Sequence, residues 1–143
     1  MSLTVDANVL VYASNEADPV HGAARMLVER LAEGPGLVYL FWPTLLGYLR
    51  IVTHPAILPR PLAPAAAIGN VTSLVALPHV RTPGEADAFW DVFRATAGAH
   101  VRGNDVPDAH LAALMRQHGV ATIYTRDRDY RRFEDLRVED PFS

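Results

Sequence analysis

The first thirteen residues constrain the fold more than any other stretch. A short apolar run, Leu3-Thr4-Val5, ends at the carboxylate of Asp6, and an apolar stretch of helical character starts near Val9. This order predicts a β-strand, a tight turn and a helix. In open parallel sheets, ligands bind in the crevice beyond the carboxyl ends of the strands. Asp6 is expected at such a crevice. A single acid there indicates a functional site only if further carboxylates lie beside it.

The rest of the chain alternates helical patterns with short apolar strands. Apolar spacings of three and four predict helices at 19–33, 42–52, 64–75 and 106–118. Thr82-Pro83-Gly84-Glu85 matches a capping box and predicts a further helix from there to about Gly98. Further strands are expected at 37–40, 78–81, 120–124 and 136–138. This alternation predicts an α/β fold, a central and mostly parallel sheet with helices on both faces, in a single domain spanning 1–143.

Composition excludes several kinds of chemistry. The chain has no cysteine, which rules out disulfides, zinc–thiolate sites and cysteine nucleophiles. All 13 basic residues are arginine, so the lysine of a phosphate-binding P-loop and a Schiff-base lysine are also excluded. No apolar run approaches the roughly 20 residues that span a bilayer, and the N-terminus lacks the pattern of a signal peptide. We therefore expect no membrane association and a cytoplasmic location.

Acidic residues from distant parts of the chain are predicted to meet at one edge of the sheet. Asp6 and Asp127 each follow a strand, and Asp108 lies in the first turn of the helix that leads back to strand 120–124. That helix must start on the same carboxyl side, and Asp129 is close by in sequence. Three or four carboxylates repel one another unless a cation joins them. Oxygen ligands suit Mg²⁺ or Mn²⁺, which support phosphodiester hydrolysis.

Each of these acids also has a purely structural explanation. Asp6 could cap the first helix, Asp105 is best interpreted as the cap of the helix from 106, and Asp108 could be a first-turn acid favoured by the helix dipole. Asp127 and Asp129 could be solvated turn residues paired with Arg126, Arg128, Arg131 and Arg132. His54, His110 and His118 lack the spacing of metal ligands and are expected at the surface or in packing. Phe89, Trp90 and Phe93 are expected in the core or an interface.

Four segments, taken in order, are similar to a known family. They are 5–13 (VDANVLVYA), Trp42 with 49–55 (LRIVTHP), Gly103-Asn104 with 108–114 (DAHLAAL), and 125–130 (TRDRDY). Together they resemble the PIN-domain ribonucleases of VapC type, the toxin halves of bacterial toxin–antitoxin pairs. The resemblance implies a PIN-like α/β/α sandwich, Mg²⁺- or Mn²⁺-dependent endonucleolytic cleavage of RNA, a homodimer, and inhibition by a small VapB-like antitoxin.

The resemblance also implies roles for individual residues. Asp6, Asp108 and Asp127 match the acids that hold the metal, and Asp129 matches a further catalytic acid. Asn8 and Thr125 match polar residues that line the site. One departure concerns the third helix, where the family commonly has a glutamate and this chain has Gly47. This loss places a second metal ion in question.

The leading hypothesis is a metal-dependent endoribonuclease of toxin type. Arg126 and Arg128 are expected to contact RNA phosphates, with Arg50 and Arg102 as further candidates. We expect an antitoxin helix to dock on apolar residues of helices 19–33 and 42–52 and on the proline-rich loop 54–64.

Two other functions compete with this hypothesis. A haloacid-dehalogenase-like phosphatase would use Asp6 as nucleophile, but it needs an aspartate at position 8, where the chain has Asn8, and a lysine. A PIN-like RNA-binding or interaction domain with a decayed site is favoured by Gly47.

Overall fold

The sheet has five strands, all parallel. The structure, a computed structural model, describes residues 2–143. The strands are β1 (Ser2–Val5), β2 (Leu37–Tyr39), β3 (Val80–Arg81), β4 (Thr122–Tyr124) and β5 (Arg137–Glu139). Their order in the sheet is β3-β2-β1-β4-β5, and every neighbouring pair is parallel. The predicted α/β class is confirmed, and the sheet is more regular than the expected mostly parallel one.

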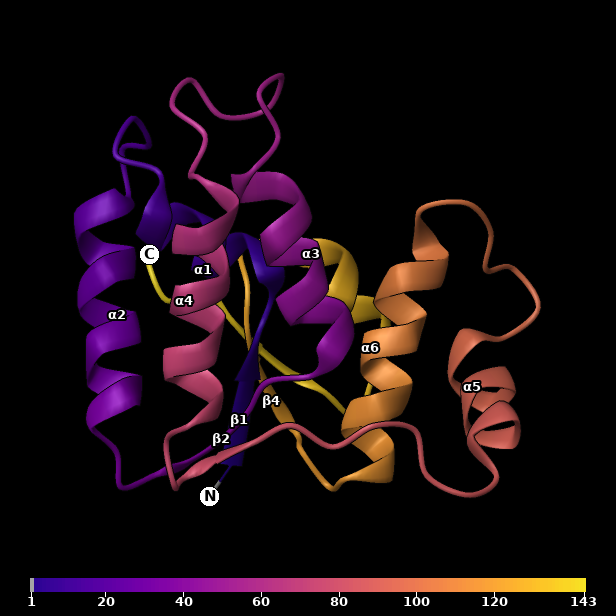
Figure 1. The fold of residues 1–143 in the computed structure, drawn as a ribbon. Coiled ribbons are helices and arrows are strands. Elements are labelled where there is room, and N and C mark those ends of the chain that lie inside the picture. The colour runs from indigo at the N-terminus through magenta and orange to yellow at the C-terminus, as the bar shows by residue number, and fades with distance from the viewer. Residues whose placement is uncertain (1) are drawn as a thin grey trace.

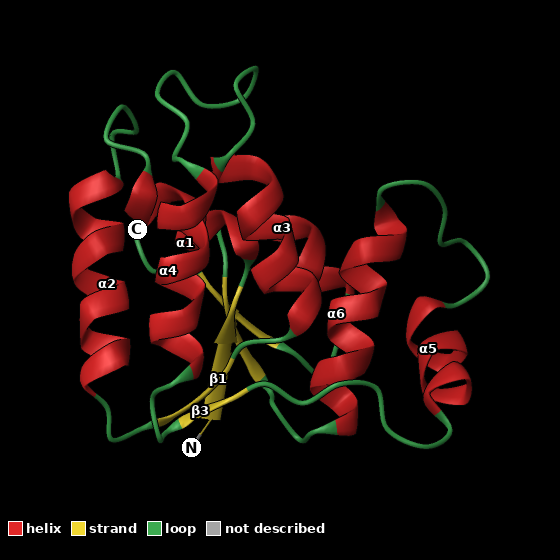
Figure 2. Cartoon of the chain, in the orientation of Figure 1, coloured by secondary structure: helices red, strands yellow, loops and turns green. Residues whose placement is uncertain are grey.

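In the part of the chain that the structure describes, six α-helices and one 3₁₀ helix connect the strands (Figures 1 and 2). They are α1 (Ala7–Ser14), α2 (His21–Glu33), α3 (Trp42–Val52), α4 (Pro64–Val75), α5 (Phe89–Ala97), α6 (Asp105–Gln117) and η1 (Arg128–Arg132). Apart from α5, the predicted helices are present with small shifts at their ends, and the first begins at Ala7 rather than Val9. None of the helices in the described part of the chain is both long and apolar enough to span a membrane.

The two faces of the sheet bury separate apolar clusters, which gives the α/β/α sandwich. On one face, Val5 and Val38 pack with residues of α1 to α4, among them Val9 and Leu45. On the other face, Ile123 packs with α6 and with aromatic residues of the 130–133 segment. Successive side chains of a strand point to opposite faces of the sheet, so a single short strand can contribute residues to both clusters. Figure 1 shows α5 outside this sandwich, at the side of the molecule away from α2 and next to α6.

The capping box predicted a helix start that the structure does not have. Residues 82–86 are irregular, and α5 begins only at Phe89, after Ala88 with a left-handed φ of 63°. Side chains of α6 hold this segment in its irregular form. His110 bonds to the Glu85 carboxylate at 2.7 Å, and the Gln117 amide bonds to the backbone of Ala86 and Asp87. The prediction was wrong because a tertiary hydrogen bond to His110 engages the Glu85 carboxylate that the capping box would use.

The cap of α6 was also predicted wrongly. Asn104 occupies the N-cap position without a side-chain capping bond, and Asp105 is already the first helical residue. The Asp105 carboxylate lies 3.6 Å from the guanidinium of Arg132 instead of accepting a backbone amide. The ion pair explains why this acid is not used as a cap.

Candidate metal and catalytic site

The acids lie at the carboxyl ends of β1 and β4, where the order in which strands are added to the sheet changes from one side of β1 to the other. The chain first adds β2 and β3 on one side of β1 and later adds β4 and β5 on the other. Asp6 directly follows β1, and its backbone N–H donates to the carbonyl of Tyr124, the last residue of β4. The crevice beyond two such strands is the usual ligand site of an open parallel sheet. Asp108 reaches the same edge from the first turn of α6.

Thr125 links the acids that follow the two strands. Its side chain is 1% exposed, and its hydroxyl donates to Asp6 Oδ2 at 2.9 Å. The same hydroxyl oxygen accepts the backbone N–H of Asp127 at 2.9 Å. Asp127 Oδ1 in turn accepts the backbone N–H of Asp129, also at 2.9 Å, and thereby caps η1. A chain of hydrogen bonds thus connects Asp6 to residues 125–129 and orders that short segment.

Three carboxylates are close enough to share one cation. Asp108, Asp127 and Asp129 each offer an oxygen, and these oxygens lie within 4.8 Å of one another. Asp6 is outside this closest group, although its charge acts on that of Asp108. An all-oxygen set of carboxylates fits a hard divalent cation such as Mg²⁺ or Mn²⁺.

Burial makes two of the acids costly to ionise. Desolvation raises the pKa of Asp6, the hydrogen bond from Thr125 opposes this effect, and the negative charge of Asp127 adds to it. Desolvation also raises the pKa of Asp108, against hydrogen bonding from Tyr130, and the charge of Asp127 again adds to it. Carboxylates in this environment gain most from a nearby positive charge.

The purely structural explanations for the acids, helix capping and pairing with arginines, hold only in part. Asp6 stands at the N-cap position of α1 but makes no capping hydrogen bond with its side chain. Within residues 2–143, no arginine forms an ion pair with Asp127 or Asp129. Arg132, expected to pair with these turn acids, instead lies 3.5 Å from Asp108. The acids of the 125–129 segment are therefore left available to a cation.

Of the other predicted contact residues, three lie beside Asp127. Thr125, Arg126 and Arg128 line a small cavity of about 90 Å³ that also includes Asp127 and Arg131. The Arg126 guanidinium lies 5.9 Å from the centre of the Tyr12 ring. The remaining predicted residues, Asn8, Arg50 and Arg102, are all exposed.

Sequence reasoning missed two residues of the site. Tyr130 is 3% exposed, and its pKa is raised by burial and by the charges of Asp6 and Asp108, so its hydroxyl stays protonated as a donor toward Asp108. Arg132 contacts Asp108 and Asp105. Both belong to the polar and basic segment that follows strand 120–124 in the sequence. Tyr130 and Arg132 follow Asp127 by three and five residues, which was the available signal in the sequence. That spacing indicates a shared site only once the residues are known to form the 3₁₀ turn η1.

The histidines have the predicted structural roles, whereas in the aromatic cluster Phe89 and Phe93 pack as predicted and Trp90 does not lie in the core. His110 bonds Glu85, His118 bonds the Gly84 carbonyl, and His54 accepts the backbone N–H of Ala56. Phe89 and Phe93 pack against the cluster around α6. Trp90 is 66% exposed and stacks on Phe93 with ring centres 5.7 Å apart.

Comparison with known proteins places these features in a family context. The PIN domain family model matches residues 3–136. Ribonuclease VapC48 of Mycobacterium tuberculosis is 57% identical over 144 aligned positions, covering 100% of this chain and 99% of the relative.

Solved structures share the fold. The crystal structure of M. tuberculosis VapC20, a sarcin–ricin-loop-cleaving toxin, has a TM-score of 0.66 at 22% identity and covers 94% of this chain and 98% of that one. VapBC2 of Rickettsia felis, bound to a DNA fragment from its promoter, has a TM-score of 0.59 at 15% identity, with coverages of 97% and 98%.

Proposed function

This chain belongs to the PIN-domain family, with VapC ribonucleases as full-length relatives, and we propose that it is a toxin-type endoribonuclease dependent on Mg²⁺ or Mn²⁺. The observation that supports the metal dependence most directly is the convergence of Asp108, Asp127 and Asp129 within 4.8 Å. Asp6, joined to Asp127 through Thr125, completes the acidic site. The chemistry is hydrolysis of an RNA phosphodiester bond.

The chain's own residues have distinct parts in this reaction. Asp108, Asp127 and Asp129 hold the cation, with Asp6 contributing directly or through water. When bound, a divalent cation lowers the pKa of an attacking water and offsets the charge of the phosphate. The Thr125 and Tyr130 hydroxyls orient the Asp6 and Asp108 carboxylates. Arg126 and Arg128, both exposed, bind RNA phosphates through their guanidinium groups.

The test is cleavage of ribosomal and transfer RNA by the purified chain with added Mg²⁺ or Mn²⁺. The double variant Asp6→Asn/Asp108→Asn is expected to lose at least about a hundredfold in rate, because it removes two negative charges from the cation site. Asp87→Asn/Asp91→Asn makes the same charge change at two exposed acids near α5 and is the matched control. Cleavage by the first variant at the rate of the control would refute the assignment.

A decayed, RNA-binding site is the second candidate, and Gly47 is the observation that favours it. A Cβ built at Gly47 would lie 3.6 Å from Ala7 Cβ, beside Asp6, so an acidic side chain there would start next to the site. Mn²⁺ titration distinguishes the two functions. A decayed site binds RNA without binding Mn²⁺ and leaves the RNA intact.

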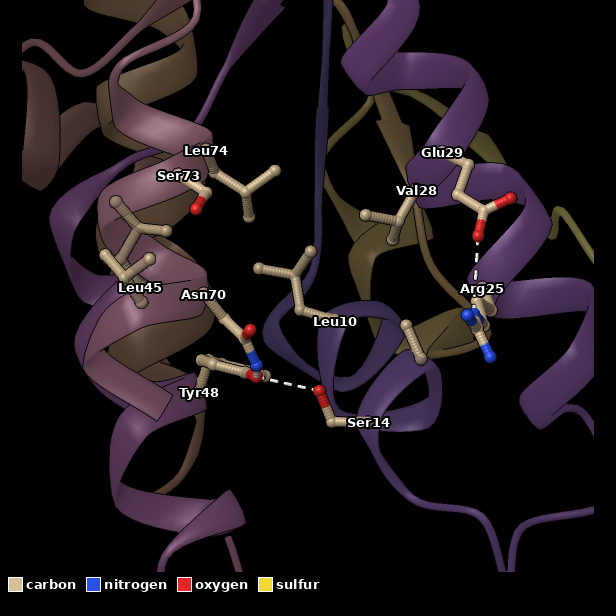
Figure 3. A pocket seen from close by; sticks show the side chains of 12 residues that line it. Leu10, Ser14, Arg25, Val28, Glu29, Leu45, Tyr48, Asn70, Ser73 and Leu74 are labelled. Carbon is tan, nitrogen blue, oxygen red and sulfur yellow. Dashed lines mark hydrogen bonds and ion pairs between the residues drawn. The ribbon is translucent and has the colours of Figure 1, made fainter. Parts of the chain in front are cut away.

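The protein partner of a toxin of this type is a small antitoxin, and two neighbouring cavities support a binding surface for it. A cavity of about 270 Å³ lies among α1, α2, α3 and α4. Figure 3 shows Leu10, Val28 and Leu74 around an apolar space, with Ser14, Tyr48 and Asn70 at one end. The Tyr48 hydroxyl is 2.7 Å from Ser14 Oγ and 2.9 Å from Asn70 Nδ2. A second cavity of about 530 Å³ adjoins Ser14 and includes residues 59–62 of the proline-rich loop.

We place the antitoxin segment in these two cavities. These cavities include residues of α2, α3 and the proline-rich loop, where the antitoxin helix is expected to dock, and they add residues of α4. Ser73→Arg, at an exposed residue lining the first cavity, is expected to weaken co-purification with the product of the adjacent small gene at least tenfold. Thr72→Arg, next to it on α4 and outside the cavity lining, is the control. Equal binding by both variants would exclude this surface.

A further inference from the structure

Arg132 joins two segments that the sequence separates by more than twenty residues. Its Nη1 donates to the Asp129 carbonyl of η1 at 3.0 Å. Its Nη2 lies 3.5 Å from Asp108 Oδ2 and 3.6 Å from Asp105 Oδ1, both in the first turn of α6. The guanidinium also lies over the Phe133 ring, 4.7 Å from its centre. One side chain therefore contacts η1, α6 and an aromatic ring.

The same two segments supply the oxygens of the cation site. Asp108 comes from the first turn of α6, whereas Asp127 and Asp129 come from the start of η1. Three carboxylates this close repel one another, and the repulsion favours movement of the α6 turn away from η1. Within residues 2–143, Arg132 is the arginine that forms an ion pair with one of these three carboxylates, that of Asp108. Its contacts oppose that movement.

Only arginine has the geometry that these contacts need. The guanidinium presents five N–H donors in a rigid plane, so it can reach acceptors in several directions at once. A lysine ammonium in the same place would keep the charge but act as a single point on a flexible stem. The substitution of lysine for arginine thus separates position from charge.

We propose that Arg132 is a positioning residue of the cation site, which holds the Asp108 carboxylate within reach of Asp127 and Asp129. It acts through Asp108 and does not contact the reacting atoms. This inference rests on the proposed function, since it assigns the acids to a bound cation. It adds a requirement to the set of acids: a link between α6 and η1 must keep the carboxylates in their relative positions.

The sign of the effect on metal affinity makes the proposal testable. A positive charge beside Asp108 repels an incoming cation, so its removal alone would tighten metal binding. Loss of the link would instead let Asp108 move away and weaken binding. A weaker affinity after removal of Arg132 can therefore not be explained by charge.

The experiment is calorimetric titration of the RNA-free chain with Mn²⁺. Arg132→Gln and Arg132→Lys are both expected to bind Mn²⁺ about fivefold or more weakly than the wild type. Arg131→Gln removes a charge from the neighbouring exposed residue of η1 and is expected to bind at least as tightly as the wild type. Unchanged or tighter binding by Arg132→Gln overturns the proposal. So does a loss confined to RNA affinity in EDTA, which would make Arg132 an RNA contact.

Hydrogen exchange of the metal-free chain supplies a readout that is independent of metal. In Arg132→Gln, the backbone amides of residues 105, 106 and 108–112 are expected to exchange faster, while those of α2 are unchanged. Equal exchange in the two proteins overturns the proposal whatever the Mn²⁺ result. If the wild type binds no Mn²⁺, the cation site of the proposed function fails, and the exchange data alone decide whether Arg132 holds the α6 turn.

Discussion

At the residue scale, the aspartates of the site are chemically unequal. Asp6 is the more enclosed of the two acids whose pKa is raised, and its main hydrogen bond comes from a threonine that is itself buried. Asp129 is exposed and reaches the group from the outer side. The inner acids therefore gain most from a bound cation, and they cost the metal-free chain stability when they are ionised.

This cost predicts a pH dependence for Asp6→Asn. Because the pKa of Asp6 is raised above the ordinary 3.8, the folded chain holds this proton more tightly than the unfolded chain does. The stability that comes from the protonated form is present below that ordinary pKa and is lost as pH rises through the folded pKa. Removal of the charge is thus expected to raise the free energy of unfolding of the metal-free chain at pH 7.5.

Urea unfolding in EDTA between pH 4 and pH 7.5 measures this effect. The gain from Asp6→Asn should shrink as the pH falls, because the wild-type carboxyl is then neutral as well. Asp91→Asn, at an exposed acid of α5, is expected to show no such trend. A gain independent of pH would mean that Asp6 is not held in a desolvating environment.

Thr125→Val tests the hydrogen-bonded link between the strands. Valine has nearly the same shape but neither donates to Asp6 nor accepts from the Asp127 amide. Leaving buried polar groups unsatisfied costs about 1–3 kcal/mol, and that loss should appear in urea unfolding. The rate of RNA cleavage should fall about tenfold or more as Asp6 and Asp127 lose their fixed spacing. Thr125→Ser keeps the hydroxyl and should retain most of both, and a Ser variant as impaired as the Val variant would contradict the role of the hydroxyl.

The position of Asp6, Asp108 and Asp127 was predictable because it depends on chain direction alone. Parallel strands end at one edge, and a helix leading back to such a strand must start there. The site roles of Tyr130 and Arg132 were not predictable in this way. They depend on which side chains of a single 3₁₀ turn face α6, and a five-residue turn has no periodic apolar pattern from which to infer its orientation.

At the element scale, tertiary contacts override local signals at both ends of the α5–α6 pair. The capping box at residues 82–85 is locally convincing, yet its glutamate bonds to His110 of α6. The first acid of α6 serves Arg132 rather than the backbone. The long apolar helices α2, α3 and α4 were predicted well because burial of one face decides them.

Helix α3 contains a glycine that its structure does not require. Gly47 lies inside the helix with helical backbone, and an added Cβ would meet Ala7 Cβ at an ordinary contact distance of 3.6 Å. Gly47→Ala is therefore expected to raise the free energy of unfolding by about 0.5–1 kcal/mol, since alanine loses less conformational entropy in a helix.

Gly69→Ala is the matched substitution in α4, where no atom lies within 4 Å of the added Cβ, and it should give a similar gain in urea unfolding. Stabilisation at Gly69 together with a loss at Gly47 would show that close packing of α3 on α1 requires glycine. That result would give a structural reason for the missing acid at this position.

At the scale of the whole molecule, the acidic site lies on the line between the two buried clusters. Val5, immediately before Asp6, belongs to one cluster, and Tyr130, beside Asp129, belongs to the other. Repulsion among the acids therefore acts on the junction between the two halves of the sandwich. A cation held by Asp108, Asp127 and Asp129 connects α6 with η1 and should stabilise the folded state.

The expected stabilisation follows from mass action. A ligand that binds only the folded state at about one hundred times its dissociation constant raises the free energy of unfolding by about 2.7 kcal/mol. Mn²⁺ should produce this gain in wild-type thermal or urea unfolding, and Asp127→Asn should abolish most of it, because Asp127 shares the oxygen group with Asp108 and Asp129. The same variant should be at least as stable as the wild type in EDTA, since it removes one of the repelling charges. Asp87→Asn keeps the site and should respond to Mn²⁺ as the wild type does. An equal response by Asp127→Asn would show that the cation stabilises the fold from a different place, and the acids at the strand ends would then need another explanation.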